Sequence, residues 1–324
     1  MRAVQIVSLT GPGDVVVADV PEPEPSHPLT PGEGVVIDVR AAGVAFPEVL
    51  QTRGRYQIKP ELPYVPGSEV AGVVRSAPQG ASVRPGDRVA ALCMLGGFAE
   101  VAVAPAYGAL ALPEQLDFAQ GAGLVVNYHS AWFALVTRGR YAEGETVLVH
   151  GAAGGIGTAT LQIAKALGAR TIAVVSSDEK ERVARAAGAD EVVRSGGAWK
   201  DAVREMGGAD VVVDPVGGDR FTDSLRSLRE GGRLVVVGFA GGAIPEVRVN
   251  RLLLNNIEVV GAGWGAWAVS HPSYSQEVGA RLEPLIAAGH VAPMVSARFP
   301  LEQAREALTL LDERGALGKV VLEV

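Results

Sequence analysis

Thiols are nearly absent from this sequence, whose 324 residues include a single cysteine, Cys93. One cysteine cannot form an intramolecular disulfide or a thiolate cluster around a metal ion. No apolar run is long enough to cross a bilayer, and the N-terminus lacks the layout of a signal peptide. The net charge of −7 argues against a broad nucleic-acid surface, which needs a basic face. We therefore expect a cytoplasmic protein with no membrane segment and no nucleic-acid partner.

Glycine is plentiful, at 41 residues, and proline is concentrated in the first third, with a PEPEP run at 21–25. Proline at this density excludes long helices. Short runs of Val, Ile and Ala at 15–20, 34–40, 70–75 and 88–91 are separated by turn signals. The first third is therefore predicted to form a compact β-rich domain.

From about residue 145 the pattern changes to strands that alternate with helices. The strands are continuous apolar runs, as expected when helices cover both faces of a parallel sheet. The alternation predicts a doubly wound parallel sheet of the Rossmann type. We expect its strands at 146–151, 171–176, 190–193, 210–215, 233–238 and 257–262. The fold class is α/β, with a Rossmann domain at 123–267 and a discontinuous β-rich domain made of 1–122 and 268–324.

A glycine-rich turn joins the first of these strands to a helix and predicts a dinucleotide site. Alanine takes the first place of the usual G-x-G-x-x-G fingerprint. The second position would let the backbone approach a pyrophosphate, and the free N–H groups of the helix would face the phosphates. A purely structural turn is the alternative. The candidate contacts in this turn are Ala152, Gly154, Gly155, Ile156 and Gly157.

The end of the second strand bears on which dinucleotide binds. Ser176 stands where an NAD enzyme usually places an acid, and a serine does not repel a 2′-phosphate. Lys180 lies one helical turn further on and can reach the same phosphate, with Arg194 as a weaker second cation. The alternatives are that Ser177 or Asp178 caps the helix beside a solvated Lys180, or that Asp178 is the acid of an NAD site. We predict NADPH as the cofactor.

The motifs follow one another as in a known family. AAGVAFPEVLQTRGRY (41–56) and LPYVPGSEVAG (62–72) resemble the N-terminal signature of the zinc-independent quinone oxidoreductases, the zeta-crystallin-like branch of the medium-chain dehydrogenases/reductases. The resemblance implies a GroES-like substrate domain built from both termini, a cleft beside the Rossmann domain, and a homodimer paired through the last Rossmann strand. The other matching segments are 85–90, 96–100, 127–132, 150–157, 214–218, 237–240 and 318–322.

The resemblance also identifies what this chain lacks relative to zinc-dependent alcohol dehydrogenases. Their zinc-ligating Cys and His correspond here to Ala45 and Ser68, and neither residue is a useful zinc ligand. Without a Lewis acid, the acceptors that remain are quinones and conjugated carbonyl compounds. Ala45 also replaces an Asn that many quinone reductases carry near the nicotinamide. We predict no metal site.

Further site residues are implied by the same resemblance. Tyr56 corresponds to the tyrosine that donates a proton in related enoyl thioester reductases, with a role in lining the pocket as the alternative. Asn127 and Ser130 are expected near the nicotinamide or its ribose, or else as helix caps. The other cofactor candidates are Val216, Gly238, Phe239, Arg314 and Lys319, the last expected to face the phosphates. The expected substrate pocket consists of Ala45, Tyr56, Trp264 and Trp267, although the tryptophans could equally belong to a subunit interface.

The predicted function is thus NADPH-dependent, zinc-free transfer of hydride to a small quinone or a related conjugated carbonyl compound. An enoyl-CoA or enone (2-alkenal) reductase shares almost every one of these residues and is the closest alternative. A non-enzymatic, crystallin-like NADPH-binding protein is the alternative of a different class.

Overall fold

The computed structural model describes all residues from Met1 to Val324, and the chain divides into two compact units. Unit 1 comprises Met1–Val126, Ala268–Ala287 and Ala292–Val324. Unit 2 comprises Asn127–Trp267 and Ala288–Val291. The first border thus lies at residue 126, where the sequence analysis places it at 122, and a short piece after residue 287 falls to unit 2.

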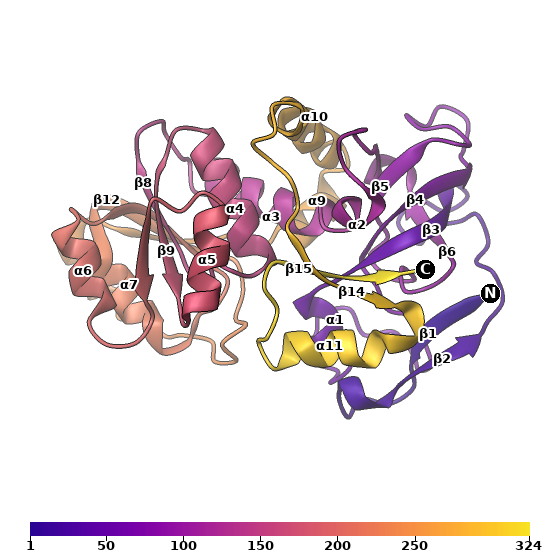
Figure 1. Cartoon of the computed structure of the whole chain (residues 1–324), viewed down its shortest axis with the longest axis horizontal. Helices are drawn as coiled ribbons and strands as arrows, with labels where there is room; N and C mark the ends of the chain where they lie inside the picture. Colours follow the sequence, from indigo (N-terminus) through magenta and orange to yellow (C-terminus); the bar gives the residue numbers. More distant parts are fainter. The chain divides into compact units, whose positions relative to one another are not determined.

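Unit 1 is built on a seven-stranded sheet in which the end of the chain pairs with its first third (Figure 1). The strand order is β14-β15-β3-β4-β5-β7, and β6 also pairs with β3. The last strand runs antiparallel to β3, with Val320 opposite Val44. The strands are β3 (Gly34–Val44), β4 (Glu69–Ser76), β5 (Arg88–Leu92), β6 (Val101–Pro105), β7 (Ala109–Ala111), β14 (Val295–Pro300) and β15 (Lys319–Glu323).

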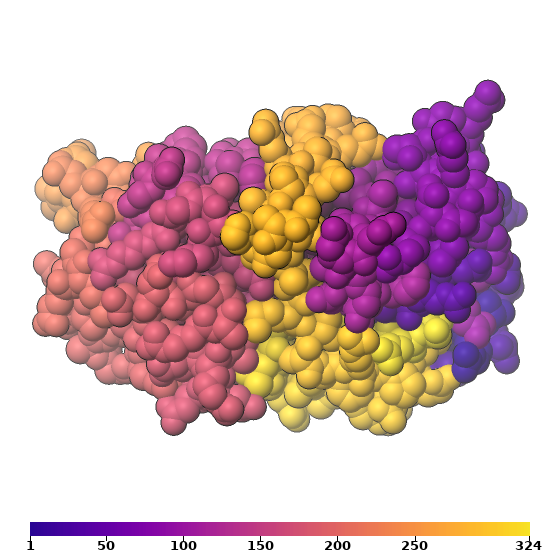
Figure 2. Space-filling view, turned by 45° about the horizontal axis from the view of Figure 1, so that its top comes forward, coloured from indigo at the N-terminus to yellow at the C-terminus, as the bar shows by residue number.

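The remaining elements of unit 1 surround this sheet. C-terminal residues (yellow) lie against N-terminal ones (indigo and purple) in Figure 2, in agreement with the pairing of β15 with β3. A single apolar core joins both ends of the chain, from Val4 through Val35 to Leu308 and Leu322. The elements are the hairpin β1 (Arg2–Ile6) and β2 (Val15–Asp19), and the helices α1 (Phe46–Gln51), α2 (Phe118–Gly121), α10 (Tyr274–Ala287) and α11 (Ala304–Asp312). Short 3-10 turns lie at Pro12–Asp14, Ala106–Gly108 and Leu301–Gln303.

Unit 2 contains a six-stranded sheet in the order β10-β9-β8-β11-β12-β13, and every pair is parallel. The helices α4 and α5 lie on one face and α6 and α7 on the other (Figure 1). The prediction of an α/β chain with a doubly wound sheet is confirmed. The strands are β8 (Thr146–Val149), β9 (Arg170–Val175), β10 (Glu191–Arg194), β11 (Ala209–Asp214), β12 (Leu228–Val236) and β13 (Glu258–Gly261). The helices are α4 (Gly155–Ala166), α5 (Asp178–Ala186), α6 (Trp199–Glu205), α7 (Phe221–Ser227) and α8 (Asn250–Asn255), with a 3-10 turn at Gly218–Arg220. Helix α9 (Trp264–Ser270) begins in unit 2 and ends in unit 1.

The helical segment that leads into unit 2 is irregular. A π-helical turn, Val125–His129, and a second one, Phe133–Arg138, flank the short α3 (Ser130–Trp132). His129 holds the N-cap position of α3, but its side chain makes no capping hydrogen bond. Asn127 and Ser130 therefore lie inside a continuous helical segment, so the alternative that they cap a helix is not what the structure has.

Strand β12 begins earlier than the sequence predicts. The strand was expected to start at residue 233, whereas α7 ends at Ser227 and β12 starts at Leu228. The ladder with β11 shifts register between Ala209 and Val211, so the intervening residues form a bulge. Gly231 lies in this bulge at φ 75°, a conformation that glycine adopts without strain.

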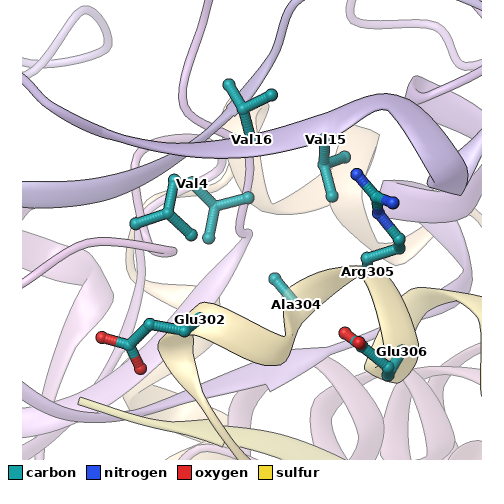
Figure 3. A pocket seen from close by; sticks show the side chains of 8 residues that line it. Val4, Val15, Val16, Glu302, Ala304, Arg305 and Glu306 are labelled. Atoms are coloured by element: carbon teal, nitrogen blue, oxygen red, sulfur yellow. The ribbon is translucent and has the colours of Figure 1, made fainter.

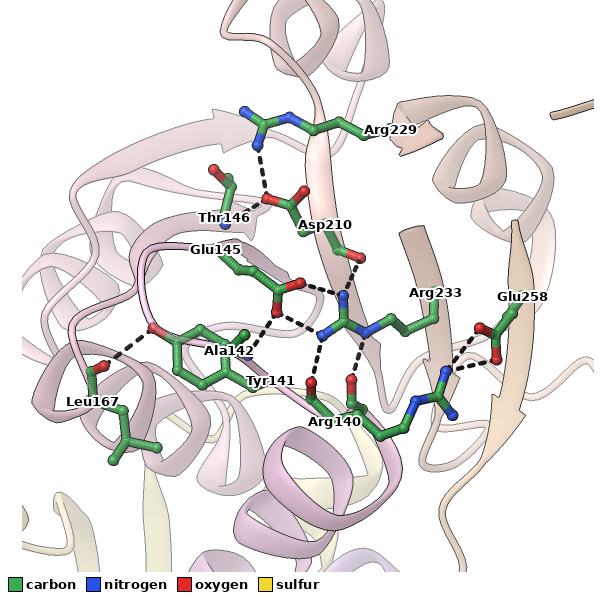
Figure 4. A network of polar contacts seen from close by, with 11 residues as sticks. Arg140, Tyr141, Ala142, Glu145, Thr146, Leu167, Asp210, Arg229, Arg233 and Glu258 are labelled. Atoms are coloured by element: carbon green, nitrogen blue, oxygen red, sulfur yellow. Dashed lines mark hydrogen bonds and ion pairs between the residues drawn. The ribbon is translucent and has the colours of Figure 1, made fainter. Parts of the chain in front are cut away.

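Arg233, on β12, ties the sheet of unit 2 to the loop before β8 (Figure 4). Its guanidinium makes a bidentate ion pair with Glu145, with both N···O distances at 2.6 Å. The same group also donates to the backbone carbonyls of Gly139 and Arg140. Although burial opposes ionisation of Glu145, the hydrogen bonds from Arg233 hold the pKa of this carboxyl below its usual value. This contact fixes the start of the strand that leads to the glycine-rich turn.

No helix in the chain has the length and apolarity that crossing a membrane requires.

Candidate functional site

The glycine-rich turn follows β8 and opens directly into α4. Gly154 is the N-terminal cap residue and Gly155 begins the helix. A Cβ atom at Gly157 would lie 2.2 Å from the carbonyl oxygen of Gly151, so only glycine allows the helix to pack this closely on the turn. Around Gly154 the nearest atom to such a Cβ would be 3.4 Å away, which leaves the backbone approachable. Ala152 is fully buried and supports the turn from within.

Two side chains from other elements rest against this turn. A Cβ atom at Gly155 would lie 2.4 Å from Nδ2 of Asn127, so the Asn127 carboxamide occupies the space beside the first turn of α4. A Cβ atom at Gly151 would lie 3.1 Å from Cγ2 of Val216, which places Val216 beside the opposite end of the turn. The structure therefore brings both predicted residues together with the glycines, at the carboxyl ends of the parallel strands where ligands bind in such sheets.

The loop that carries Val216 is held by the buried carboxylate of Asp214. Its Oδ1 accepts the backbone N–H of Val216 at 2.8 Å and that of Gly217 at 3.0 Å. Gly217 has φ 65°, and a Cβ there would lie 2.9 Å from Phe239, so these two loops pack together. Gly238 is half-buried and Phe239 is exposed at the end of the next strand. Asp214 thus shapes the loop without itself facing outward.

At the end of β9 the structure joins the two residues on which the cofactor prediction rests. Nζ of Lys180 lies 3.4 Å from Oγ of Ser176, and Ser176 is exposed. Ser177 is the N-cap of α5, since its hydroxyl accepts the N–H of Lys180, while the side chain of Asp178 is 98% exposed and pairs with Arg194. A serine hydroxyl and an ammonium group side by side form a suitable cradle for a phosphate.

Arg194 is engaged by carboxylates. Its Nη2 lies 2.5 Å from Asp178 and 2.5 Å from Glu181, so its charge is already balanced on α5.

Trp264 is buried and meets the His129 ring edge to face at 5.6 Å, which gives it a packing contact inside unit 2. Trp267 is half-buried, with its ring 5.5 Å from that of Phe133.

In unit 1 a buried carboxylate organises the segment around Ala45. Ala45 is the N-cap of α1, and its N–H donates to Oε2 of Glu48 at 2.9 Å. Oε1 of Glu48 accepts the backbone N–H of Ser68 at 2.9 Å and its hydroxyl at 2.5 Å. Glu48 is fully buried, whereas Ser68 is half-buried. The predicted pocket residue Ala45 therefore lies beside an acid that the sequence analysis did not single out.

Tyr56 is half-buried near the same carboxylate. Burial raises the pKa of its hydroxyl, and the charge of Glu48 raises it further. The phenol therefore keeps its proton at any physiological pH, as a proton donor or a hydrogen-bond donor must. The structure is compatible with both roles that the sequence leaves open for Tyr56.

Lys319 differs from its expected position facing the cofactor phosphates. The residue is 3% exposed, and its Nζ lies 2.5 Å from Oε1 of Glu69, which is itself fully buried. The second oxygen of Glu69 accepts the N–H of Val126 at 2.8 Å. Because this ion pair encloses the ammonium, Lys319 does not present its charge to the cofactor phosphates as expected. Arg314 is exposed just after α11, with φ 60°.

A hollow of about 410 Å³ lies in unit 1 between the hairpin β1–β2 and α11 (Figure 3). Its apolar wall comes from Val4, Val15 and Val16, and its charged rim from Glu302 and Arg305. None of the residues predicted to belong to the site lines this hollow. The hollow is therefore separate from the candidate residues described above.

Glu48 and Asp214 are the functional candidates that sequence reasoning missed or left without a role. Each is an acid surrounded by apolar neighbours, in FPEVL and VVVDPV. A charged residue inside an apolar run is rarely buried unless it is hydrogen-bonded, and this was the available signal.

Two family models match the chain: "Alcohol dehydrogenase GroES-like domain" over residues 31–114 and "Zinc-binding dehydrogenase" over 155–280. A bovine protein described as quinone oxidoreductase-like protein 2 is 38% identical over 92% of this chain and 87% of its own. The chain belongs to the quinone oxidoreductase family. A solved structure of a quinone oxidoreductase from Thermus thermophilus, described with its NADPH complex, is 34% identical over the whole of both chains, with a TM-score of 0.86. A probable oxidoreductase from Mycobacterium abscessus is 45% identical, with a TM-score of 0.90 over 100% of this chain and 99% of its own.

The zinc named in one family description does not fit the side chains of this quinone oxidoreductase family member. Ala45 offers no donor atom, and the Ser68 hydroxyl already donates to Glu48. No group of three or more His, Cys, Asp or Glu side chains in the chain could hold a metal ion. The lone thiol, Cys93, is buried, and burial raises its pKa to about 12, so it is not a thiolate ligand.

Proposed function

We propose that this member of the quinone oxidoreductase family binds NADPH and transfers a hydride, without a metal, to a quinone or a related conjugated carbonyl compound. The observation that carries the proposal is the pairing of Ser176 with Lys180 at the end of the strand that follows the glycine-rich turn. The NADPH complex of the Thermus thermophilus relative supports it.

The contacts to the cofactor follow from the residues around the turn. The backbone of Gly154 and Gly155 and the N-terminus of α4 would hold the pyrophosphate. Ser176 and Lys180 would hold the 2′-phosphate, the ammonium by charge and the hydroxyl by hydrogen bonding. Asn127 and Val216, one on each side of the turn, would contact the nicotinamide half of the molecule.

The bound cofactor supplies the hydride, and the protein supplies position and polarity. The carboxamide of Asn127 is held against Gly155 and can orient a ligand there. Tyr56 keeps its proton and can donate a hydrogen bond to an acceptor oxygen as negative charge develops on it. Acceptors that need a Lewis acid, such as simple ketones, are excluded by the donor set at Ala45 and Ser68.

The acceptor class is tested with NADPH oxidation by the wild-type protein. We expect turnover of 1,4-benzoquinone and 9,10-phenanthrenequinone that exceeds turnover of a simple enone and of crotonyl-CoA, with NADPH preferred over NADH. Steady-state absorbance of NADPH measures this directly. The Tyr56→Phe variant is expected to lose less than about 10-fold in kcat with quinones, since one neutral hydrogen bond is worth about 1 kcal/mol.

Tyr107→Phe is the matched control, because Tyr107 is also a half-buried tyrosine of unit 1. Faster turnover of crotonyl-CoA, with a large loss in Tyr56→Phe but not in Tyr107→Phe, would instead make the protein an enoyl thioester reductase. Tight NADPH binding with no turnover of any acceptor would contradict an enzymatic role and leave a cofactor-binding protein.

A further inference from the structure

Glu48 is more firmly held than a helix cap requires. As the third residue of α1 it accepts the N–H of Ala45, which is the half of a capping box that an alanine N-cap allows. Its other oxygen instead reaches a segment twenty residues away, where it accepts both the N–H and the hydroxyl of Ser68. Complete burial of a carboxyl costs free energy, and all the polar contacts of this one lie on two loops. Capping a six-residue helix does not require such burial.

Ser68 is fixed from both sides. Its carbonyl oxygen accepts the N–H of Cys93 at 2.7 Å and that of Met94 at 3.1 Å, while its own N–H and hydroxyl point to Glu48. Ser68 is half-buried and Glu48 fully buried, so of this hydrogen-bonded pair only the serine residue reaches the surface of unit 1. This is the geometry of a two-member proton path.

The charges near Glu48 determine when it holds a proton. Burial raises the pKa of Glu48 above its usual value, while the Ser68 hydrogen bond, the positive charge of Lys319 and the backbone N–H of Ala45 act in the opposite direction. Tyr56 also lies within electrostatic range of Glu48 and is neutral. Lys319 is itself paired with Glu69, which reduces the influence of its charge. The net effect favours the protonated acid over a wider pH range than for an exposed glutamate.

We infer that Ser68 and Glu48 form the proton relay of the reductase, in which the Ser68 hydroxyl protonates the oxyanion of the reduced acceptor and Glu48 reprotonates Ser68. This inference rests on the proposed function, since it requires an acceptor that becomes an oxyanion on taking up a hydride. It assigns to the two residues a role that Tyr56 would otherwise have to fill alone.

The step balances as follows. The acceptor gains a hydride, and therefore two electrons, and becomes a hydroquinone anion or an enolate. Once Glu48 is protonated, its O–H replaces the Ser68 hydroxyl as the donor between the two side chains, so the serine O–H can turn to the acceptor. The O–H bond of Ser68 breaks as a new O–H bond forms on the acceptor oxygen. The proton on Glu48 then moves to Oγ of Ser68, which leaves Glu48 as a carboxylate with hydrogen bonds from Ala45 and Ser68. After product release, a proton from water returns to Glu48 through Ser68.

Infrared difference spectroscopy tests the protonation of Glu48 without cofactor or turnover. We expect a protonated-carboxyl C=O band that shifts in D₂O, titrates at higher pH than exposed glutamates, and disappears in Glu48→Gln. The band should persist in Ser68→Ala, because both backbone N–H contacts to Glu48 remain. The relay would be overturned if lowering the pH to the range in which exposed carboxyls titrate still gave a wild-type spectrum identical to that of Glu48→Gln.

Quinone turnover tests the proton transfer itself. Ser68→Ala is expected to lower kcat by about 10²-fold, with little change in the Kd for NADPH, and Ser68→Thr should restore most of the activity. The wild-type rate should fall as pH rises through the pKa of Glu48 and slow in D₂O, and both effects should be absent in Ser68→Ala. Ser26→Ala is the control, since that hydroxyl of unit 1 only accepts a backbone N–H from Gly32.

The outcomes separate the relay from the function on which it rests. Quinone reduction by Ser68→Ala with the pH profile and solvent isotope effect of the wild type would overturn the relay and leave the proposed function intact. A wild-type protein that binds NADPH but reduces no acceptor would overturn both, whatever the infrared spectrum shows.

Discussion

Replacing Lys319 by methionine is expected to lower the free energy of unfolding by about 3–5 kcal/mol. The ammonium of Lys319 and the carboxylate of Glu69 are both buried and lie 2.5 Å apart. Removal of the lysine leaves the charge of Glu69 in the interior with one remaining backbone partner, the N–H of Val126. An uncompensated buried charge costs far more than the pair contributes, which is why the single variant should be so damaging.

Two comparisons make this prediction specific. Lys165→Met breaks an exposed pair with Asp190 and should cost less than about 1 kcal/mol. The double variant Lys319→Met/Glu69→Gln should recover much of the loss, because a neutral amide can still accept from Val126. Unfolding in urea should be followed by circular dichroism, since all four tryptophans lie in unit 2 and Lys319 lies in unit 1. A loss in Lys319→Met no greater than that in Lys165→Met would contradict the account of a buried pair.

Ser176→Asp is expected to weaken NADPH binding by about 10²-fold and to leave NADH binding equal or stronger. The carboxylate would stand beside the 2′-phosphate and repel it, and like charges placed face to face cost several kcal/mol. The same carboxylate can accept hydrogen bonds from the ribose hydroxyls of NADH. Lys180 would then pair with the new acid across the 3.4 Å that now separates it from Ser176.

Ser177→Asp is the matched control for this switch. Ser177 is the N-cap of α5, and aspartate caps a helix as well as serine does, so this variant adds the same charge one residue further on without disturbing the helix. Calorimetric titration with NADPH and NADH measures both variants. An equal loss of NADPH affinity in the two would show that only net charge matters, and an unchanged preference for NADPH in Ser176→Asp would contradict the assignment of the phosphate site.

The features that the sequence predicted well depend on local pattern. Continuous apolar runs followed by helical periods are enough to specify the parallel sheet of unit 2, and the turn from Ala152 to Gly157 is required by its own close contacts. The N-cap role of Ser177, which the sequence analysis gave as one alternative beside Asp178, and the proximity of Ser176 to Lys180 also follow from a few neighbouring residues.

The features that escaped prediction depend on partners far away in the chain. Lys319 looks like a surface cation until β15 pairs with β3 and brings it to Glu69, 250 residues distant. Glu48 looks like an ordinary helical glutamate until the loop at Ser68 closes over it. The strand character of Leu228 is set by its ladder with Ala209, because the residues that follow it are polar and glycine-rich. The spacing of apolar residues along the sequence does not report these long-range contacts.

The central claim is hydride transfer from NADPH by a protein without a catalytic metal. Its most direct test is reduction of 9,10-phenanthrenequinone by the wild-type protein after exhaustive dialysis against a zinc chelator, with NADPH deuterated in turn at each C4 position. We predict an unchanged rate after chelation and a primary isotope effect for one of the two deuterated positions. Activity that is lost on chelation and restored by zinc would contradict the account.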